Sequence, residues 1–269
     1  MIELLAPAFV TCLLLAGVLG YFGLHVLLRE VIFVDLALAQ LAALGVAVAH
    51  MVASEASPAT IYLWSFAFTL AGAAIFAGVR TERRRVPQEA LIGIVYGVSA
   101  ALVILVLSKS ALDRDEVESM LTGRLLFVEW SEVGLTALLC AGIAALHVLL
   151  RRAFLDISRR GATASPPARR ERLLDFVFYA SFGVVVTSSV QMAGVLVVFS
   201  LLIVPAACAA LFLISLRGRL LGGWGIGTLA SAAGVVASAL WDLPTGASVV
   251  AALGAAFALS LCASAILRE

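Results

Sequence analysis

Long stretches without a charged residue dominate the pattern of polar and apolar positions along this chain of 269 residues. A helix needs about 20 apolar residues to cross about 30 Å of hydrocarbon. The run 176–216 would be about 60 Å long as a helix, so it must hold two spans joined by a turn near Gln191. The stretch 31–54, whose only charged residue is Asp35, adds another span. The remaining runs of sufficient length are 4–28, 56–79, 90–108, 133–150, 220–241 and 243–267. The pattern predicts an all-α, polytopic membrane protein with about nine transmembrane helices.

The composition agrees with this fold class. Apolar residues make up 63% of the chain and charged residues 13%, against about 45–50% and about 25% in soluble domains. Too few charged residues remain to cover a water-facing surface, so the expected surroundings are a lipid bilayer. The formal net charge is +1. A nucleic-acid partner is not expected, because such proteins carry a clustered basic excess.

The basic residues fix the expected orientation of the spans. In strictly alternating loops, 15 of the 18 basic residues fall on one side, and only Lys109, Arg114 and Arg124 fall on the other. Short loops rich in Lys and Arg stay in the cytoplasm. The sequence therefore predicts an N-terminus outside, a C-terminus in the cytoplasm, and one transmembrane domain over residues 1–269.

Two segments outside the spans have their own character. The segment 151–172 contains the polar stretch DISRRGATASPPARRER, which is typical of a flexible cytoplasmic loop and separates five predicted spans from four. The segment 111–132 lies on the outer side and is predicted to form an amphipathic helix on the membrane surface. Its apolar positions at helical spacing are Val117, Met120, Leu121 and Leu125.

The chain lacks the signatures of an enzyme. Its only lysine is Lys109, which excludes a Walker A loop, and no H-E-x-x-H or G-x-S-x-G motif occurs. The four cysteines are far apart inside apolar runs, so neither a disulfide framework nor a zinc site is expected. Among the scattered histidines, His50 is placed at the outer end of its span, where a substrate would arrive. We expect no catalytic residue and no cofactor bound by this chain.

Asp35 is the one carboxylate inside a predicted span. A charge at that depth indicates a functional site or a pairing partner. One hypothesis places Asp35 on a substrate path as a possible metal contact. The other pairs it with Arg29, about one and a half turns away. Gln40 is a second polar candidate for the path, but five positions rotate it about 140° from Asp35, so the two cannot share a helical face.

The segment SVQMAGVLVVFSLLIVPAACA, 189–209, is the densest motif of the second half. Gln191 can hydrogen-bond across helices at the outer boundary, Gly194 permits close backbone approach, and Pro205 can bend its helix near the cytoplasmic end. The basic stretch 213–223 follows, with Arg217 and Arg219. This order favours a mechanical contact with a cytoplasmic partner, and ordinary helix packing is the alternative.

Five segments together resemble the zinc/manganese permease family of ABC importers. In chain order they are GVLGYFGLHVLLREVIFVDLALAQLAALGVAVA, ALIGIVYGVSAALVILVLS, EVESMLTGRLLFVEWSEV, SVQMAGVLVVFSLLIVPAACA and LWDLPTGASVVAALGAAFALSL. The resemblance covers nearly the whole chain. It implies a permease that works as a homodimer in the cytoplasmic (inner) membrane of a prokaryote. Its implied partners are ATPase subunits inside, which use the ATP, and a metal-binding receptor protein outside.

The second span departs from the family pattern. The family usually has Gly-Asp-x-x-x-His-Ala there, with Asp and His on one helical face able to hold a transition metal. In this chain Leu36 takes the position of that aspartate and Gln40 that of the histidine, while Asp35 is one residue early. A Gln oxygen is a poorer zinc ligand than imidazole. Either the path conducts the ion without binding it, or the substrate differs.

These observations predict the permease subunit of an ATP-driven importer for zinc, manganese or iron. The alternatives are an ABC permease of the same build for a non-metal substrate and a stand-alone secondary transporter driven by an ion gradient. The segment 213–223, with Arg217 and Arg219, is the expected coupling helix for the ATPase. The expected receptor-docking charges are Asp113, Asp115, Glu116, Glu118 and Arg124.

Overall fold

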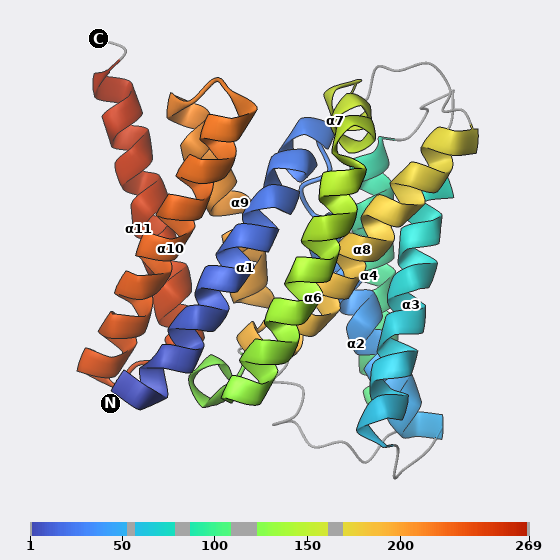
Figure 1. Ribbon diagram of the computed structural model, residues 1–269. Helices are drawn as coiled ribbons and strands as arrows, with labels where there is room; N and C mark the ends of the chain where they lie inside the picture. Colours follow the sequence, from blue (N-terminus) through green and yellow to red (C-terminus); the bar gives the residue numbers. More distant parts are fainter. Residues whose placement is uncertain (1, 53–56, 79–86, 109–122, 161–168, 268–269) are drawn as a thin grey trace. The chain divides into compact units, whose positions relative to one another are not determined.

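The computed structural model describes residues 2–52, 57–78, 87–108, 123–160 and 169–267, and every regular element in these ranges is a helix (Figure 1). Nine of these helices are long and apolar enough to cross a membrane, which confirms the predicted number of spans. They are α1 (Ile2–Arg29), α2 (Val34–Val52), α3 (Pro58–Gly78), α4 (Gln88–Leu107), α6 (Trp130–Leu149), α8 (Arg169–Ala193), α9 (Val195–Phe212), α10 (Leu216–Trp241) and α11 (Thr245–Ile266). The two shorter elements are η1 (Leu125–Phe127) and α7 (Arg151–Arg160).

The chain divides into two compact units that interleave along the sequence. Unit 1 comprises Met1–Leu27, Leu121–Leu146 and Ser189–Glu269, and unit 2 comprises Leu28–Met120 and His147–Ser188. Helices α9, α10 and α11 belong to unit 1, whereas α2, α3, α4 and α7 belong to unit 2. Helices α1, α6 and α8 contribute residues to both units.

In unit 2, α2 packs against α3 and α4. Gly45 lets the backbones of α2 and α3 approach closely, since a Cβ at this position would lie 2.6 Å from Ser65 Cα. Helix α8 joins α3 through the hydroxyls of Thr69 and Thr187, whose oxygens are 3.1 Å apart. Such small residues and hydroxyl contacts hold the helices together, because the hydrophobic effect does not drive helices to associate within lipid.

In unit 1, α9, α10 and α11 pack against one another. A Cβ on Gly234 of α10 would lie 2.5 Å from Val249 Cα of α11, so this crossing requires glycine. The turn between α8 and α9 occurs at Gly194, which has a φ of 80° and is the N-cap of α9. The predicted division of 176–216 into two spans near Gln191 is therefore confirmed.

Three segments differ from the sequence-based expectation or lie partly outside the described residues. The predicted loop 151–172 contains helix α7, and α8 already begins at Arg169. The predicted surface helix 111–132 lies outside the described residues up to 122, and beyond that point it consists of the 3-10 turn η1 and the start of α6. The coupling helix expected at 213–223 is not a separate element. Residues 213–215 connect α9 to α10, and the rest is the first part of α10.

Candidate functional site

Asp35 lies in the first turn of α2 and is only 2% exposed. Its Oδ1 is buried and has no hydrogen-bond partner among the residues that the structure describes. Burying a carboxylate in this way is costly unless the charge is compensated. Asp35 is therefore a place where a proton or a cation would be stabilised.

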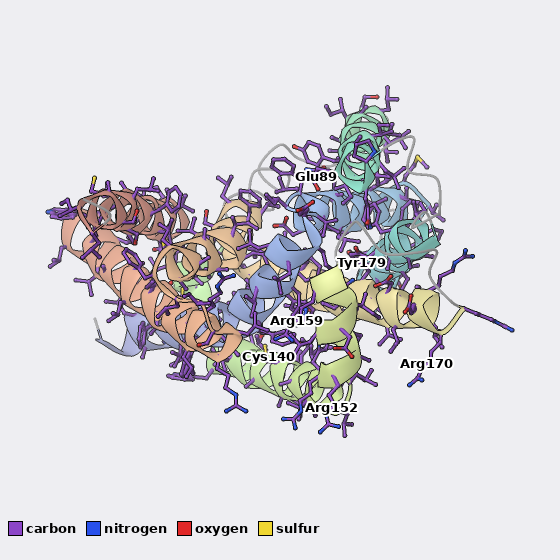
Figure 2. All side chains as sticks on the ribbon, turned by 90° about the horizontal axis from the view of Figure 1, so that it is seen from above. Glu89, Cys140, Arg152, Arg159, Arg170 and Tyr179 are labelled. Carbon is purple, nitrogen blue, oxygen red and sulfur yellow. The ribbon has the colours of Figure 1, made fainter. Side chains whose placement is uncertain are left out.

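A second carboxylate, Glu89, lies beside Asp35. Glu89 is in the first turn of α4, which packs against α2, and it is labelled in Figure 2. Its Oε1 accepts a hydrogen bond from the backbone N–H of Phe33 at 3.2 Å, which ties the starts of α2 and α4 together. Its Oε2 is buried without a hydrogen-bond partner among the described residues. Each of the two carboxylates thus has one buried oxygen without a hydrogen-bond partner among the described residues. Sequence reasoning overlooked Glu89, because a residue at the edge of a span looks like a loop charge.

Arg29 does not pair with Asp35. Its Nη1 donates to Asp175 Oδ1 on α8 at 2.8 Å, and its Nε donates to Ser158 Oγ on α7, also at 2.8 Å. The guanidinium carbon lies 3.9 Å from the centre of the Phe178 ring, a cation–π distance. The hypothesis that Asp35 neutralises Arg29 is wrong in this structure, because Asp175 takes that role.

Two other polar candidates for the path, Gln40 and His50, lie farther along α2 than Asp35. Gln40 on α2 is half-buried, and its side-chain amide forms no hydrogen bond with another residue of the described ranges. His50, in the last turn of α2, is hydrogen-bonded through Nδ1 to Val46 O at 3.0 Å, a contact within its own helix. Gln191, near the end of α8, is exposed and belongs to unit 1. Within the described ranges, no three His, Cys, Asp or Glu side chains come together as a metal centre.

Gly194 and Pro205 have structural roles in unit 1. Gly194 ends α8 and begins α9, and Gly123 packs against this turn with a φ of 69°. Pro205 is buried inside α9, where Gly227 of α10 approaches it. A Cβ on Gly227 would lie 3.1 Å from Pro205 Cγ and 3.3 Å from Ala16 Cβ. Pro205 therefore marks the place where α1, α9 and α10 pack together.

The two arginines predicted to couple the chain to an ATPase differ in their surroundings. Arg219 donates from Nε to Leu213 O at 2.7 Å and so holds the end of α9 against the start of α10. The same turn is capped by Ser215, whose hydroxyl accepts from the Gly218 N–H. Arg217 is exposed, and Ile214 beside it is 94% exposed. Arg217 is thus the more exposed of the two arginines.

Helix α7 is a second basic surface, which sequence reasoning did not find. Its buried side carries Phe154, Ile157 and Ser158, and its exposed side carries Arg152 and Arg159, both labelled in Figure 2. The Phe154 ring stacks near those of His147 and Phe178, with centres 4.6 and 5.7 Å away. The signal in the sequence that could have revealed this helix is the spacing of Phe154, Ile157 and Ser158, which places them on one helical face. Helix α7 therefore combines a fixed inner side with a basic outer side.

Of the residues expected to dock a receptor, only Arg124 is described. Asp113, Asp115, Glu116 and Glu118 lie outside the described residues. Arg124 forms a salt bridge with Glu132 in the first turn of α6, and its backbone N–H donates to Met192 O at 2.9 Å. This ion pair fixes the segment that leads into α6.

Comparison with known proteins adds a family and several relatives. A family model described as the ABC 3 transport family matches residues 1–264. The manganese transport system membrane protein MntC of Listeria innocua is 25% identical over 246 residues, which cover 91% of this chain and 85% of that protein. The high-affinity zinc uptake system membrane protein ZnuB of Haemophilus influenzae is 26% identical over 268 residues, which cover 97% of this chain and 98% of that protein.

A solved structure has the same fold. It is PsaBC from Streptococcus pneumoniae in complex with Fab, which matches with a TM-score of 0.74 at 22% identity. The match covers 96% of this chain and 90% of the matched chain.

Proposed function

Because the chain belongs to the ABC 3 transport family, we propose that it is the membrane permease subunit of an ATP-driven importer for a divalent transition metal. The single observation that carries this proposal is the family match over residues 1–264, which covers eight spans completely and the ninth except for its last two residues. The family match also weakens the alternative of a stand-alone secondary transporter. ATP hydrolysis belongs to a separate subunit in this proposal, because the chain has no Walker A lysine.

The substrate class follows from the relatives and from Asp35. MntC and ZnuB are named for manganese and zinc transport, and the pair Asp35 and Glu89 offers this chain's open carboxylate oxygens to a cation. Two carboxylates are too few to hold a transition metal tightly, so they would guide the ion rather than store it. Oxygen donors suit manganese better than zinc, for which imidazole is the better ligand. Manganese is therefore the favoured cargo.

The partners follow the same reasoning. The exposed arginines of α7 and Arg217 at the start of α10 lie at the ends where the charge distribution puts the cytoplasm, and they suit contact with an ATPase. The acidic segment 113–118, which the charge distribution assigns to the outer side, suits a metal-binding receptor. A homodimer in the inner membrane of a bacterium, with the N-terminus outside, completes the proposed assembly.

The test is metal uptake by the reconstituted importer. The permease is produced together with its ATPase subunit and its metal-binding receptor protein, and uptake of radioactive manganese and zinc is measured in proteoliposomes. The control replaces the Walker A lysine of the ATPase. We expect ATP-dependent uptake that the control abolishes and that a protonophore leaves intact. Uptake that continues without ATP and stops with the protonophore would support the secondary transporter instead.

A further inference from the structure

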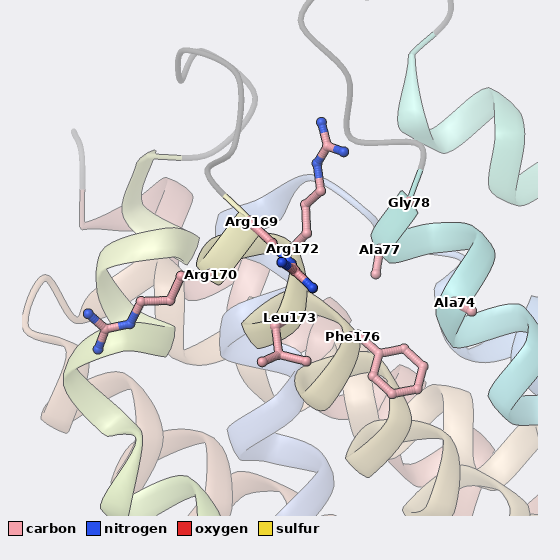
Figure 3. Close-up of a pocket in the computed structure, with 8 residues that line it drawn as sticks. All are labelled: Ala74, Ala77, Gly78, Arg169, Arg170, Arg172, Leu173 and Phe176. Atoms are coloured by element: carbon pink, nitrogen blue, oxygen red, sulfur yellow. The ribbon is translucent and has the colours of Figure 1, made fainter.

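An open hollow of about 770 Å³ lies between the end of α3 and the start of α8, both in unit 2 (Figure 3). Apart from three arginines, the residues that line it are apolar. Ala74 and Gly78 contribute from α3, and Leu173 and Phe176 contribute from α8. A Cβ on Gly78 would meet no described atom within 4 Å, so the hollow is open at this point. It is formed by elements other than those that carry Asp35 and Glu89.

Three arginines border the hollow. Arg169, Arg170 and Arg172 are all in the first turn of α8 and are exposed. None of them forms an ion pair with another residue of the described ranges. With Glu171 counted, this turn still carries a net charge of +2. The positive end of the α8 dipole adds to that charge, so the turn is a place where an anion is stabilised.

The length of α8 indicates the depth of the hollow in a bilayer. Helix α8 has 25 residues and is about 37 Å long, so it exceeds a hydrocarbon core of about 30 Å and its first turn reaches the headgroup layer. Helix α3 ends at Gly78 beside that turn. From these lengths we expect the arginines at the level of the lipid phosphates, and Leu173, which is 62% exposed, and Phe176 at the level of the acyl chains.

From this arrangement we propose that an anionic phospholipid binds in the hollow. Its phosphate is held by Arg169 and Arg172, and one acyl chain lies along Ala74, Leu173 and Phe176. The apolar walls distinguish a lipid from a soluble phosphate, which would use the arginines alone. Basic pockets between transmembrane helices on the cytoplasmic side are suited to anionic headgroups. The site stands independently of what the protein transports.

The test measures lipid binding to the purified full-length chain. Phosphatidylglycerol, phosphatidylcholine and inorganic phosphate are titrated separately, with bound lipid counted by native mass spectrometry and the unfolding temperature followed in parallel. The charge variant is Arg169→Gln with Arg172→Gln. Its matched control is Arg151→Gln with Arg152→Gln on α7, which removes the same charge from another exposed pair.

A second variant, Gly78→Leu, fills the hollow without changing a charge. Its control is Gly97→Leu on α4, since a Cβ there also meets no described atom within 4 Å.

We expect phosphatidylglycerol to bind more tightly than phosphatidylcholine. The charge variant should weaken the binding of phosphatidylglycerol by about fivefold per arginine, or about 25-fold for the pair. Gly78→Leu should also weaken phosphatidylglycerol binding. Both controls should bind this lipid as the wild type does. Equal binding of the two lipids, or an unchanged affinity in the charge variant, would overturn the proposal. Stabilisation by inorganic phosphate equal to that by phosphatidylglycerol would also overturn it, because the site would then hold a soluble anion.

Discussion

Arg29, the last residue of α1, is bonded to Asp175 of α8 at a distance of 2.8 Å although 146 positions separate them in the sequence. Both side chains are almost completely buried. Arg29 also donates to Ser158, so the pair joins α7 to α1 and α8. The position of α7 therefore depends on this buried ion pair.

Replacing Asp175 with Asn should destabilise the protein by about 3–5 kcal/mol, because Arg29 then keeps its charge in a buried place without a counter-charge. The measurement is the unfolding temperature and yield of the purified protein. Combining Asp175→Asn with Arg29→Gln removes both charges and should recover part of the loss. If the single variant is as stable as the wild type, the pair does not hold these helices together.

Gly45→Ala should impair the packing of α2 on α3. The added Cβ would lie 2.6 Å from both Ser65 Cα and Trp64 O, which are backbone atoms that cannot move without shifting α3. We expect a loss of about 1–3 kcal/mol, the range for overpacked cores. Gly97→Ala is the matched control, since no described atom lies within 4 Å of its Cβ position. The control should be neutral or gain up to about 1 kcal/mol from helix propensity. Equal stability of the two variants would argue against the tight crossing.

Arg217→Glu should weaken association with the ATPase while leaving the permease folded, because Arg217 is exposed and the charge reversal repels an acidic partner. Arg219→Gln should act differently. It removes the bond to Leu213 O and should loosen the connection between α9 and α10. Co-purification with the ATPase and the unfolding temperature together separate the two effects.

The basic side of α7 can be compared with Arg217 in the same assay. We expect Arg152→Glu with Arg159→Glu to reduce co-purification as well, because both side chains are exposed on a helix whose inner side is fixed. Full ATPase binding and uptake in this pair and in Arg217→Glu would exclude both surfaces as the contact.

Neutralising Asp113, Asp115, Glu116 and Glu118 should slow docking of the receptor. Charges at the edge of an interface steer association, so the loss should be on the order of tenfold at low ionic strength and should shrink as salt is added. Stopped-flow mixing of receptor and permease measures the rate. Arg124→Gln is a useful comparison, because it breaks the salt bridge to Glu132 without changing the acidic cluster. Unchanged docking rates at low salt would place the receptor elsewhere.

The sequence predicts the spans well because their signal is local. Length and absence of charge are enough to locate nine helices and to place the turn between α8 and α9 near Gln191, three residues before its position at Gly194. Helix α7 was read as part of a loop, because ten residues with four arginines lack the apolar content of a span. Its amphipathic spacing, with Phe154, Ile157 and Ser158 buried, is visible only when the segment is considered as a helix in its own right.

The candidate site was harder to predict because its contacts are not local. Asp35 and Arg29 are close in sequence, so a pair between them is the simplest hypothesis, yet Arg29 finds Asp175 far along the chain. Glu89 comes near Asp35 only because α4 packs against α2. No periodicity in either segment indicates this neighbour.

Metal uptake by Asp35→Asn tests the central claim most directly. The substitution keeps the shape of the side chain and removes its charge, and Asp242→Asn, at an exposed left-handed position that Asn tolerates, is the matched control. We expect Asp35→Asn to show normal yield and normal ATPase binding. Its manganese uptake should fall at least tenfold, on the order expected for losing one charge in a low-dielectric path. The control should transport as the wild type does. Arg29→Gln should not rescue the variant, because Asp175 is the partner of Arg29. Manganese and zinc uptake at the wild-type rate in Asp35→Asn would contradict a path through this carboxylate.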